Sequence, residues 1–334
     1  MTYKYALIDT ANTFFRARHV ASRNSDPWEK VGMALHLTLA SVNQVVRKFG
    51  IDHVVFCLEG KSWRKSYYEP YKKNRIVDTQ SQTQAEKEEN ELFWETYEKF
   101  TTFLRERTNV SVLRDPQAEA DDLIARWVAL HPEDENFIIS SDTDFIQLIS
   151  EKNKIYNGIT NQLITLEGYF DDKGKIVKDK KTGEPKLLGD PQFILFEKCM
   201  RGDSTDNVFS AYPGVRTKGT KNKVGLIEAY ADREKQGFSW NNLQLQRWSD
   251  HNGVEHRVRD DYERNKVLID LTAQPQDIKD KVDANIREGV RTTVTPQVGV
   301  HFMRFCGSYE LTKISEQSDT YAKWLNNPYK GSLT

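Results

Sequence analysis

The chain has 334 residues, of which 38% are hydrophobic and 29% are charged, and its formal net charge is −1. This composition is typical of a globular protein and is sufficient for one large domain or two smaller ones. Its three cysteines are widely separated and form no CxxC pair, so neither a disulfide framework nor a zinc site is indicated. No apolar run approaches the roughly 18 residues that cross a bilayer, and residues 1–9 lack the features of a signal peptide. We therefore expect a cytoplasmic protein without membrane association.

Charge is strongly segregated along the chain despite the small net value. Residues 61–75 (KSWRKSYYEPYKKNR) carry six basic side chains against one acidic, and residues 214–223 (GVRTKGTKNK) carry four against none. Residues 119–144, in contrast, contain five closely spaced carboxylates in the motifs AEADD and SSDTD. Basic segments that hold a polyanion next to an acidic metal site would produce this pattern, which favours a nucleic-acid substrate.

Three short apolar segments each lead into an acidic side chain. Residues 3–9 (YKYALID) are β-prone and end at Asp9, residues 53–58 (HVVFCL) are followed by Glu59, and residues 136–140 (NFIIS) lead to Asp142 and Asp144. A helical pattern separates the first two strands, with Val31, Leu35, Leu39, Val42 and Val46 on one face and Gly50 at its end. Strands that alternate with helices predict an α/β fold with a mostly parallel, doubly wound sheet, whose acids share one edge.

Further helices and one surface insertion follow from shorter patterns. Phe93, Tyr97, Phe100 and Leu104 form the core-facing stripe of a helix, and residues 118–131 form a second helix that Pro132 ends. Residues 170–189 are rich in Lys and Gly and predict a solvated insertion. Helices are also expected over residues 191–200, from Val224 to Tyr230 and over residues 262–271, whereas residues 239–261 and the region beyond 293 give no assignment.

Clustered carboxylates raise one another's pKa and need a cation among them. Their oxygen ligands suit Mg²⁺ or Mn²⁺ better than zinc. Two such ions can activate water and stabilise the attacking and leaving oxygens of a phosphodiester. The helix geometry places Glu119 and Asp122 on one face and directs Asp121 away from them, so Asp121 is the weakest of these candidates. A third cluster, GDSTDN, contributes Asp203 and Asp206.

The order and spacing of these motifs resemble the 5′ nucleases of the flap endonuclease family. The resemblance is carried by LIDT, FCLEGKSWRK, YKKNR, AEADD, SSDTDF and MRGDSTDN, and it extends over residues 3–270. It is strongest to the T-even bacteriophage ribonuclease H type, a 5′ to 3′ exonuclease, also in YYxxYKKNR and NKVLID. Two positions depart from the family: Glu59 stands where Asp is usual, and the duplex-binding signature GVxGIGxK appears as GVRTKGTKNK.

The resemblance implies a PIN-like core with two Mg²⁺ ions, for which Mn²⁺ could substitute, and a K⁺ ion at the duplex-binding segment. It implies that Lys72 and Arg75 contact the scissile phosphate and that Tyr71 stacks on the terminal base. A 5′ end would thread through a helical arch over residues 76–108, and residues 203–232 would form a helix-three-turn-helix that grips duplex DNA. The implied metal ligands are Asp9, Glu59, Glu119, Asp121, Asp122, Asp142, Asp144, Asp203 and Asp206; the implied nucleic-acid contacts are Lys61, Arg64, Lys65, Tyr71, Lys73, Arg216, Lys218, Lys221 and Lys223.

These implications lead to one principal hypothesis. We expect a nuclease core over residues 1–189 and a smaller helical region over residues 190–334. The enzyme would remove RNA primers and adjacent DNA at 5′ flaps, nicks or RNA–DNA hybrid ends during replication, as a monomer that works with a single-stranded-DNA-binding protein or a sliding clamp. The alternatives are a non-catalytic relative that binds branched DNA and a PIN-type endoribonuclease. The density of acids disfavours the former, because a pure binder gains nothing from negative charge beside phosphates.

Overall fold

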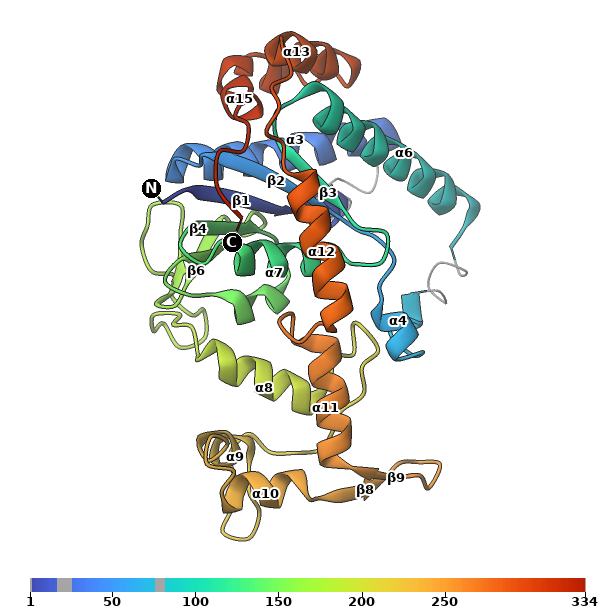
Figure 1. Cartoon of the computed structure of the whole chain (residues 1–334), viewed down its shortest axis with the longest axis vertical. Coiled ribbons are helices and arrows are strands. Elements are labelled where there is room, and N and C mark those ends of the chain that lie inside the picture. Colours follow the sequence, from blue (N-terminus) through green and yellow to red (C-terminus); the bar gives the residue numbers. More distant parts are fainter. Residues whose placement is uncertain (1, 17–25, 76–81, 334) are drawn as a thin grey trace. The chain divides into compact units, whose positions relative to one another are not determined.

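The computed structural model describes residues 2–16, 26–75 and 82–333. The chain forms two compact units and passes between them more than once (Figure 1). Unit 1 comprises Met1–Lys61, Gln82–Leu188 and Asp277–Thr334, and unit 2 comprises Ser62–Ser81 and Gly189–Gln276.

A seven-stranded sheet forms the centre of unit 1. Its order is β3-β2-β1-β4-β5-β6-β7, and the first five strands in this order are parallel while the last two are antiparallel. The strands are β1 (Lys4–Asp9), β2 (His53–Leu58), β3 (Ser111–Arg114), β4 (Glu135–Ile139), β5 (Asn153–Asn157), β6 (Gln162–Thr165) and β7 (Gly168–Phe170). The predicted mostly parallel α/β sheet is therefore confirmed. Its central strands β1, β2 and β4 are largely apolar because helices cover both faces.

One face of the sheet is covered by α1 (Thr10–Phe15), α3 (Pro27–Phe49) and α6 (Gln84–Arg107). The predicted stripe of Phe93, Tyr97, Phe100 and Leu104 is completely buried in this layer. Helix α3 ends at Gly50, whose φ of 65° is the left-handed conformation that glycine adopts readily. The C-terminal helices α13 (Val298–Ser308), α14 (Thr312–Ser315) and α15 (Ser318–Leu325) join the same core, with Phe305 stacked on Phe103 at 4.3 Å.

The opposite face is packed by α7 (Ala120–Leu130), which contacts β1, β2 and β3. Trp127 of this helix meets Tyr5 of β1 edge-on at 5.2 Å between ring centroids. Helix α12 (Gln276–Gly289) lies beside α7 and is joined to it by an ion pair in which Arg126 Nε approaches Asp283 Oδ1 at 2.6 Å (Figure 1). The sheet is therefore buried between two helical layers.

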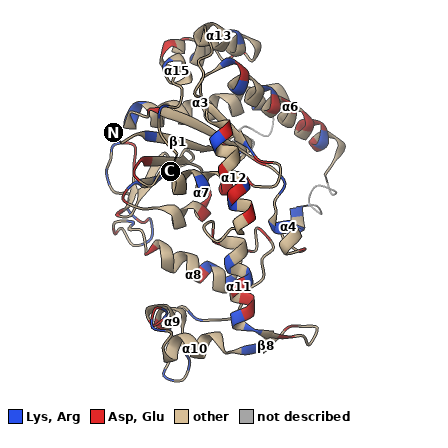
Figure 2. Cartoon of the chain, viewed as in Figure 1, with Lys and Arg blue, Asp and Glu red and all other residues tan. Residues whose placement is uncertain are grey.

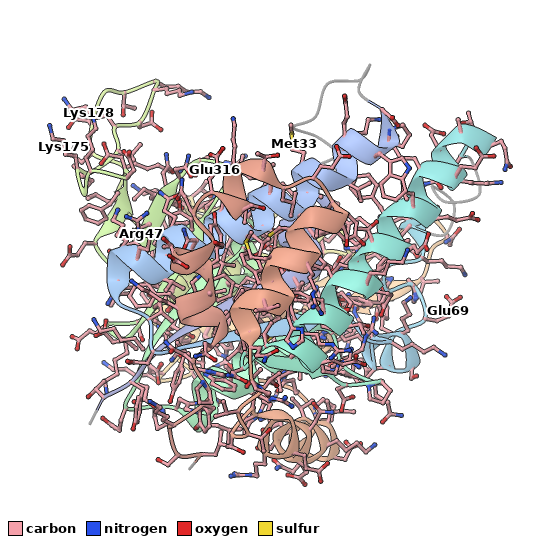
Figure 3. All side chains as sticks on the ribbon, turned by 90° about the horizontal axis from the view of Figure 1, so that it is seen from above. Met33, Arg47, Glu69, Lys175, Lys178 and Glu316 are labelled. Atoms are coloured by element: carbon pink, nitrogen blue, oxygen red, sulfur yellow. The ribbon has the colours of Figure 1, made fainter. Side chains whose placement is uncertain are left out.

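The predicted insertion over residues 170–189 continues from β7 as an exposed extension. It forms isolated bridges from Phe170 to Ile176 and from Lys178 to Pro185. Figure 3 shows Lys175 and Lys178 projecting from this segment, at the margin of the ribbon. Its turns are held by Asp171 and Asp179, whose carboxylates accept nearby backbone N–H groups. The segment is thus a surface structure, as its composition predicts.

Unit 2 is built from α4 (Arg64–Tyr67), α8 (Pro191–Arg201), α9 (Leu226–Ala231), α10 (Phe238–Gln244), α11 (Val258–Ile269) and the ribbon of β8 (Arg247–Ser249) and β9 (Glu255–Arg257). Phe196, Met200, Leu226 and Leu243 meet in its principal core. Asp190 caps α8 by accepting the N–H of Gln192 at 2.9 Å, and Pro191 is its first residue.

The compact units differ from the two-segment division expected from sequence. Residues 62–81 are grouped with unit 2, and the last 58 residues, Asp277–Thr334, with unit 1. The physical reason for the second difference is α13 to α15, whose apolar side chains join the core of unit 1. Of the predicted arch, residues 76–81 lie outside the described residues, and the remainder is largely the single helix α6.

Helix α6 begins with a capping box between Thr83 and Glu86 and carries seven glutamates over its length. Figure 2 shows acidic residues along both α6 and α12. Within the described part of the chain, no helix combines the length and the apolar character that crossing a membrane requires.

Candidate functional site

Three parallel strands end close together at one edge of the sheet in unit 1. β1 lies between β2 and β4, with Asp9 in register with Cys57 and Ile8 in register with Ile139. The chain builds β2 and β3 on one side of β1 and then crosses to β4 on the other side. The carboxyl edge at β1 and β4 is thus a topological switch point, where α/β sheets bind ligands. The acids expected to share an edge do lie at this edge.

Asp9 is the most deeply buried of these acids that follow a strand. Its side chain is 3% exposed, and it accepts hydrogen bonds from the Ser140 hydroxyl at 2.9 Å and from the Asn12 N–H at 3.2 Å. Burial raises the pKa of Asp9 to about 7, and the negative charges of Glu59 and, to a smaller extent, Asp142 add to this effect, while the two hydrogen bonds oppose it. The carboxylate of Asp9 is therefore close enough to those of Glu59 and Asp142 to be repelled by them.

The SSDTD motif follows β4 and begins the short 3-10 helix η1 (Thr143–Leu148). Asp142 caps this helix by accepting the Asp144 N–H at 2.9 Å, and its own N–H donates to the Ser140 hydroxyl at 3.0 Å. Ser140 therefore connects Asp9 to Asp142 through its single hydroxyl. Both Asp142 and Asp144 are half-buried at the sheet edge.

The AEADD motif forms the start of α7. Asp122 is completely buried and accepts the Glu119 N–H at 3.1 Å, so a helix-capping role accounts for its position. The Ala120 N–H donates to Glu59 at 3.3 Å, which brings the carboxylate that follows β2 to this helix start. Asp121 is half-buried. Burial raises the pKa of the Cys57 thiol, and the charges of Asp9, Asp121 and Glu59 raise it further. Glu59 and Asp121 therefore belong to the same electrostatic neighbourhood as Asp9.

The donor set at this edge fits a hard divalent cation, because its carboxylates repel one another and a cation would relieve that repulsion. Asp9, Glu59 and Asp142 are the residues that would hold it, with Asp121 nearby. Across residues 2–16, 26–75 and 82–333, however, no group of three or more His, Cys, Asp or Glu side chains is arranged to hold a metal ion. Backbone N–H and hydroxyl groups take up several of the carboxylate oxygens instead.

The GDSTDN carboxylates, which belong to unit 2, have different partners. Asp203 pairs with Lys198 at 2.7 Å and accepts the Thr205 N–H at 2.8 Å. The net effect of these partners lowers the pKa of Asp203, although its burial acts in the opposite direction. Asp206 contacts Arg75 at 2.8 Å and Lys72 at 3.6 Å. Because each acid already has a cationic partner, the predicted assignment of these two residues to a metal does not fit this structure.

Two residues of the basic segment 61–75 are buried, contrary to the expectation that they contact nucleic acid. Arg64 is 1% exposed, donates from Nε to the Leu268 carbonyl at 2.8 Å and lies over the Trp63 ring. Tyr71 is 4% exposed and packs with Cys199, Val208, Leu268 and Ile269. In this conformation the guanidinium of Arg64 and the ring of Tyr71 support the fold of unit 2 and cannot meet a phosphate or stack on a base.

The remaining predicted contacts in both basic segments are accessible. Lys61, Lys65, Lys73 and Arg75 are exposed, while Lys72 is half-buried, and Lys73 forms a surface ion pair with Glu69 at 2.5 Å. In the loop before α9 the exposed basic residues are Arg216, Lys218, Lys221 and Lys223. This loop is folded around Glu228, whose carboxylate accepts the N–H groups of Gly219 at 2.9 Å and Gly225 at 3.0 Å.

The two glycines of this loop have no room for a side chain, because a Cβ on Gly225 would lie 2.3 Å from the Gly219 nitrogen. The duplex-binding signature GVxGIGxK is changed in this loop to GVRTKGTKNK, yet the Glu228 carboxylate still holds the loop in one conformation. Sequence reasoning also missed Ser140, whose hydroxyl joins Asp9 to Asp142. The serine doublet of the SSDTD motif is the signal that marks this residue.

Comparison with known proteins agrees with the geometry. Residues 4–178, slightly more than half of the chain, match the family model of the 5′-3′ exonuclease N-terminal resolvase-like domain. The chain is 28% identical over 231 residues to flap endonuclease Xni of Shewanella loihica (strain ATCC BAA-1088 / PV-4), covering 68% of this chain and 77% of that protein. It is 25% identical over 234 residues to a 5′-3′ exonuclease of Buchnera aphidicola subsp. Baizongia pistaciae (strain Bp), covering 69% and 68%.

The fold is also found among solved structures. The T5 D15 protein co-crystallized with metal ions superposes with a TM-score of 0.58 at 20% identity, covering 85% of this chain and 98% of that one. T5 5′-exonuclease with bound zinc gives the same TM-score over 86% of this chain and 99% of that one. The fold and the family model together lead to one assignment: the chain belongs to the 5′-3′ exonuclease family.

Proposed function

We propose that the protein is a divalent-metal-dependent 5′ nuclease that hydrolyses phosphodiesters of DNA at 5′ flaps and nicks and of RNA primers paired to DNA. The observation that carries this proposal is the set of acids at the switch point of unit 1, where Glu59 and Asp142 add to the effect of burial and raise the pKa of Asp9 to about 7. A pure DNA-binding surface would place positive charge there, since negative charge repels phosphates.

The roles of the chain's residues follow from this placement. Asp9, Glu59 and Asp142 would hold the cations, and Ser140 would fix the orientation of Asp9 and Asp142. Bound Mg²⁺ or Mn²⁺ would supply Lewis-acid stabilisation of the attacking and leaving oxygens. We assign Lys72 and Arg75 to the phosphate of the cleaved bond, and Arg216, Lys218, Lys221 and Lys223 to the duplex backbone. Cleavage would leave a 5′-phosphate and a 3′-hydroxyl.

The T-even ribonuclease H type, with its removal of RNA primers in replication, is the narrower form of this proposal. It is supported by the YYxxYKKNR and NKVLID motifs. Two metal ions, a K⁺ ion at the basic loop, and a clamp or single-stranded-DNA-binding partner also belong to the proposal. One structural neighbour, the T5 D15 flap endonuclease, forms a pseudo-enzyme-product complex with DNA and metal ions, which supports the substrate class.

A cleavage assay tests the proposal directly. The protein is incubated with end-labelled 5′-flap, nicked-duplex and RNA-primed substrates in Mg²⁺, Mn²⁺, Ca²⁺ or EDTA, and product lengths are read on a gel. We expect cleavage in Mg²⁺ and Mn²⁺ only, and none by Asp142→Asn, which should still bind the flap substrate in Ca²⁺. Cleavage in EDTA, or full turnover by Asp142→Asn, would reject the assignment, and binding without any cleavage by the parent would indicate the non-catalytic alternative.

A further inference from the structure

Asp206 is the centre of a compact polar cluster within unit 2. Its carboxylate accepts a hydrogen bond from the Tyr71 hydroxyl at 3.0 Å, is bound by Arg75 Nη2 at 2.8 Å and lies 3.6 Å from Lys72 Nζ. The three partners all belong to the five-residue YKKNR turn, which is separated from Asp206 by more than 130 residues in sequence. One carboxylate therefore contacts the hydroxyl of Tyr71 and two of the three basic side chains of this turn.

The backbone reinforces the same contact. The Lys72 N–H donates to the Asp206 carbonyl at 2.8 Å, and Asn207 Nδ2 donates to the Pro70 carbonyl at 2.7 Å. Lys72 and Asn207 both have positive φ, 55° and 56°, a conformation that non-glycine residues rarely adopt. Such backbone strain persists only where surrounding contacts hold it, and it is typical of functional sites. The turn and the GDSTDN loop thus fix each other in one arrangement.

We propose that Asp206 is a positioning residue that holds Lys72 and Arg75 ready for phosphate, and that it does not ligate a metal ion. The part of the inference that concerns phosphate rests on the proposed nuclease function. A cation at Asp206 would have to displace the side chains of Lys72 and Arg75. The Lys72 side chain is only 13% exposed, and the low local dielectric strengthens its attraction to Asp206. A substrate phosphate, in contrast, would attract Lys72 and Arg75 away from the Asp206 carboxylate, and both side chains would again pair with an anion.

The proposal predicts opposite effects on binding and on the chemical step. Removing the charge of Asp206 frees both basic groups from a competing anion, so metal-free affinity for a 5′-phosphorylated oligonucleotide stays equal or rises. The same change leaves the Lys72 and Arg75 side chains without a fixed position, so single-turnover cleavage slows by about ten-fold or more, as expected when catalytic groups are displaced. A metal ligand would differ in metal binding, because its loss weakens the affinity for Mn²⁺, whereas loss of a positioning residue leaves that affinity unchanged.

The experiment compares the full-length parent with Asp206→Asn, Asp206→Glu and Glu197→Gln. Glu197 is the matched control because it also binds an arginine in unit 2, Arg201 at 2.9 Å, but is assigned no metal or phosphate. Hydrogen exchange of peptides that cover residues 68–75 is measured without metal, and Mn²⁺ binding is measured by electron paramagnetic resonance. We expect exchange about ten-fold faster in Asp206→Asn, partial rescue in Asp206→Glu and no change in the control.

Mn²⁺ affinity should agree among these variants within about two-fold, whereas Asp9→Asn should lose about ten-fold or more. Parent-like exchange in Asp206→Asn, together with an equally large loss of Mn²⁺ affinity, would overturn the proposal. If Asp206→Asn does not fold, Arg75→Gln removes the exposed arm of the cluster and should accelerate exchange in the same peptides. The exchange measurement uses no substrate, so a parent that cleaves nothing would reject the proposed function and leave the positioning role to be decided by exchange alone.

Discussion

The hydroxyl of Ser140 donates a hydrogen bond to Oδ2 of Asp9 at 2.9 Å and so joins the ends of β1 and β4 at the switch point of the sheet. The same oxygen accepts the Asp142 N–H at 3.0 Å. Asp9 is otherwise held by the Asn12 N–H and the Asp142 carboxylate by the Asp144 N–H, so Ser140 is the group that connects the Asp9 carboxylate to the backbone of Asp142 against the mutual repulsion of the two carboxylates. The hydrogen bond therefore keeps the candidate cation site in place when no cation is bound.

Asp9→Asn should stabilise the metal-free protein at alkaline pH. Because the folded-state pKa of Asp9 is about 7 and the ordinary value is 3.8, its contribution to stability is complete below pH 3.8 and is lost as pH rises through 7. Asn cannot ionise, so above pH 7 the variant should exceed the parent in free energy of unfolding by up to about 4 kcal/mol, at about 1.4 kcal/mol per pKa unit. Urea unfolding in EDTA at pH 5 and pH 8.5 measures the difference.

Added Mg²⁺ provides the control for that measurement. A ligand that binds only the folded state raises its stability, so the parent should gain stability with Mg²⁺ concentration and Asp9→Asn should gain much less. Equal stability of the two proteins at pH 8.5 in EDTA would contradict the raised pKa, and an equal gain from Mg²⁺ would contradict the role of Asp9 as a ligand.

Lys72 and Lys73 are adjacent lysines that should differ sharply in function. Lys72 is half-buried against Asp206, whereas Lys73 is exposed and pairs with Glu69 on the surface. Loss of a group that stabilises transition-state charge typically slows chemistry by about 10² or more, so Lys72→Ala should lower the single-turnover rate to this extent. Lys73→Ala is the matched control and should change the rate by less than about three-fold, as expected of a surface pair. Similar rates for the two variants would reject the assignment of Lys72.

The exposed lysines of the loop before α9 should set the salt dependence of duplex binding. Each phosphate that a lysine neutralises adds about 0.9 to the slope of log affinity against log salt. Lys218→Ala together with Lys221→Ala should therefore reduce the slope by about 1 to 2 without altering the substrate structures preferred. Replacing Lys178 and Lys180 in the insertion after β7 gives the control at equal charge. If replacement of Lys178 and Lys180 reduces the salt slope more than replacement of Lys218 and Lys221, the insertion and not the loop before α9 contacts the duplex.

The sheet could be predicted from sequence because its central strands are continuous apolar runs. Residues 53–58 were expected as a strand and form β2 with the same bounds, and the strand that leads to Asp142 is displaced by a single residue. β3 (SVLR) and β5 (NKIYN) escape prediction because each contains only two consecutive apolar residues between polar ones, so neither forms a recognisable apolar run. The C-terminal helices escape it because their apolar faces are recognisable only against the partner core.

In the candidate site, too, the features that follow from local sequence could be predicted, and those that depend on tertiary contacts could not. The acids after strands could be placed at one edge because topology follows from the strand pattern. The partners of Asp206 could not, because Tyr71, Lys72 and Arg75 are remote in sequence and motif matching groups this acid with metal ligands. Arg64 shows the same limit, since a basic segment does not reveal which guanidinium turns inward to the Leu268 carbonyl.

His53 should make the protein less stable below neutral pH. It is 1% exposed in β2, and its Nδ1 lies 2.9 Å from the Asn327 carbonyl and its Nε2 2.8 Å from the Ser111 hydroxyl. The Ser111 oxygen also accepts the Arg291 N–H, so its hydroxyl donates to Nε2 and Nδ1–H donates to Asn327. The ring is thus held neutral, and burial lowers the pKa of His53 to about 4.

The direction of the pH effect follows from this lowered pKa. Above pH 6.5 both folded and unfolded states carry neutral His53; between 6.5 and 4 only the unfolded state takes up a proton, so stability falls, by on the order of 3 kcal/mol in total. Below pH 4 the loss stops. His53→Gln should remove this loss of stability from the pH dependence of urea unfolding in this window, whereas His251→Gln, on the exposed turn between β8 and β9, should keep the parent's slope. The parent and His53→Gln share the opposite contribution of Asp9, so their difference isolates His53. An equal dependence of the two proteins on pH from 6.5 to 4.5 would show that the ring accepts a proton in the folded state, and therefore that the contacts to Ser111 and Asn327 open in solution.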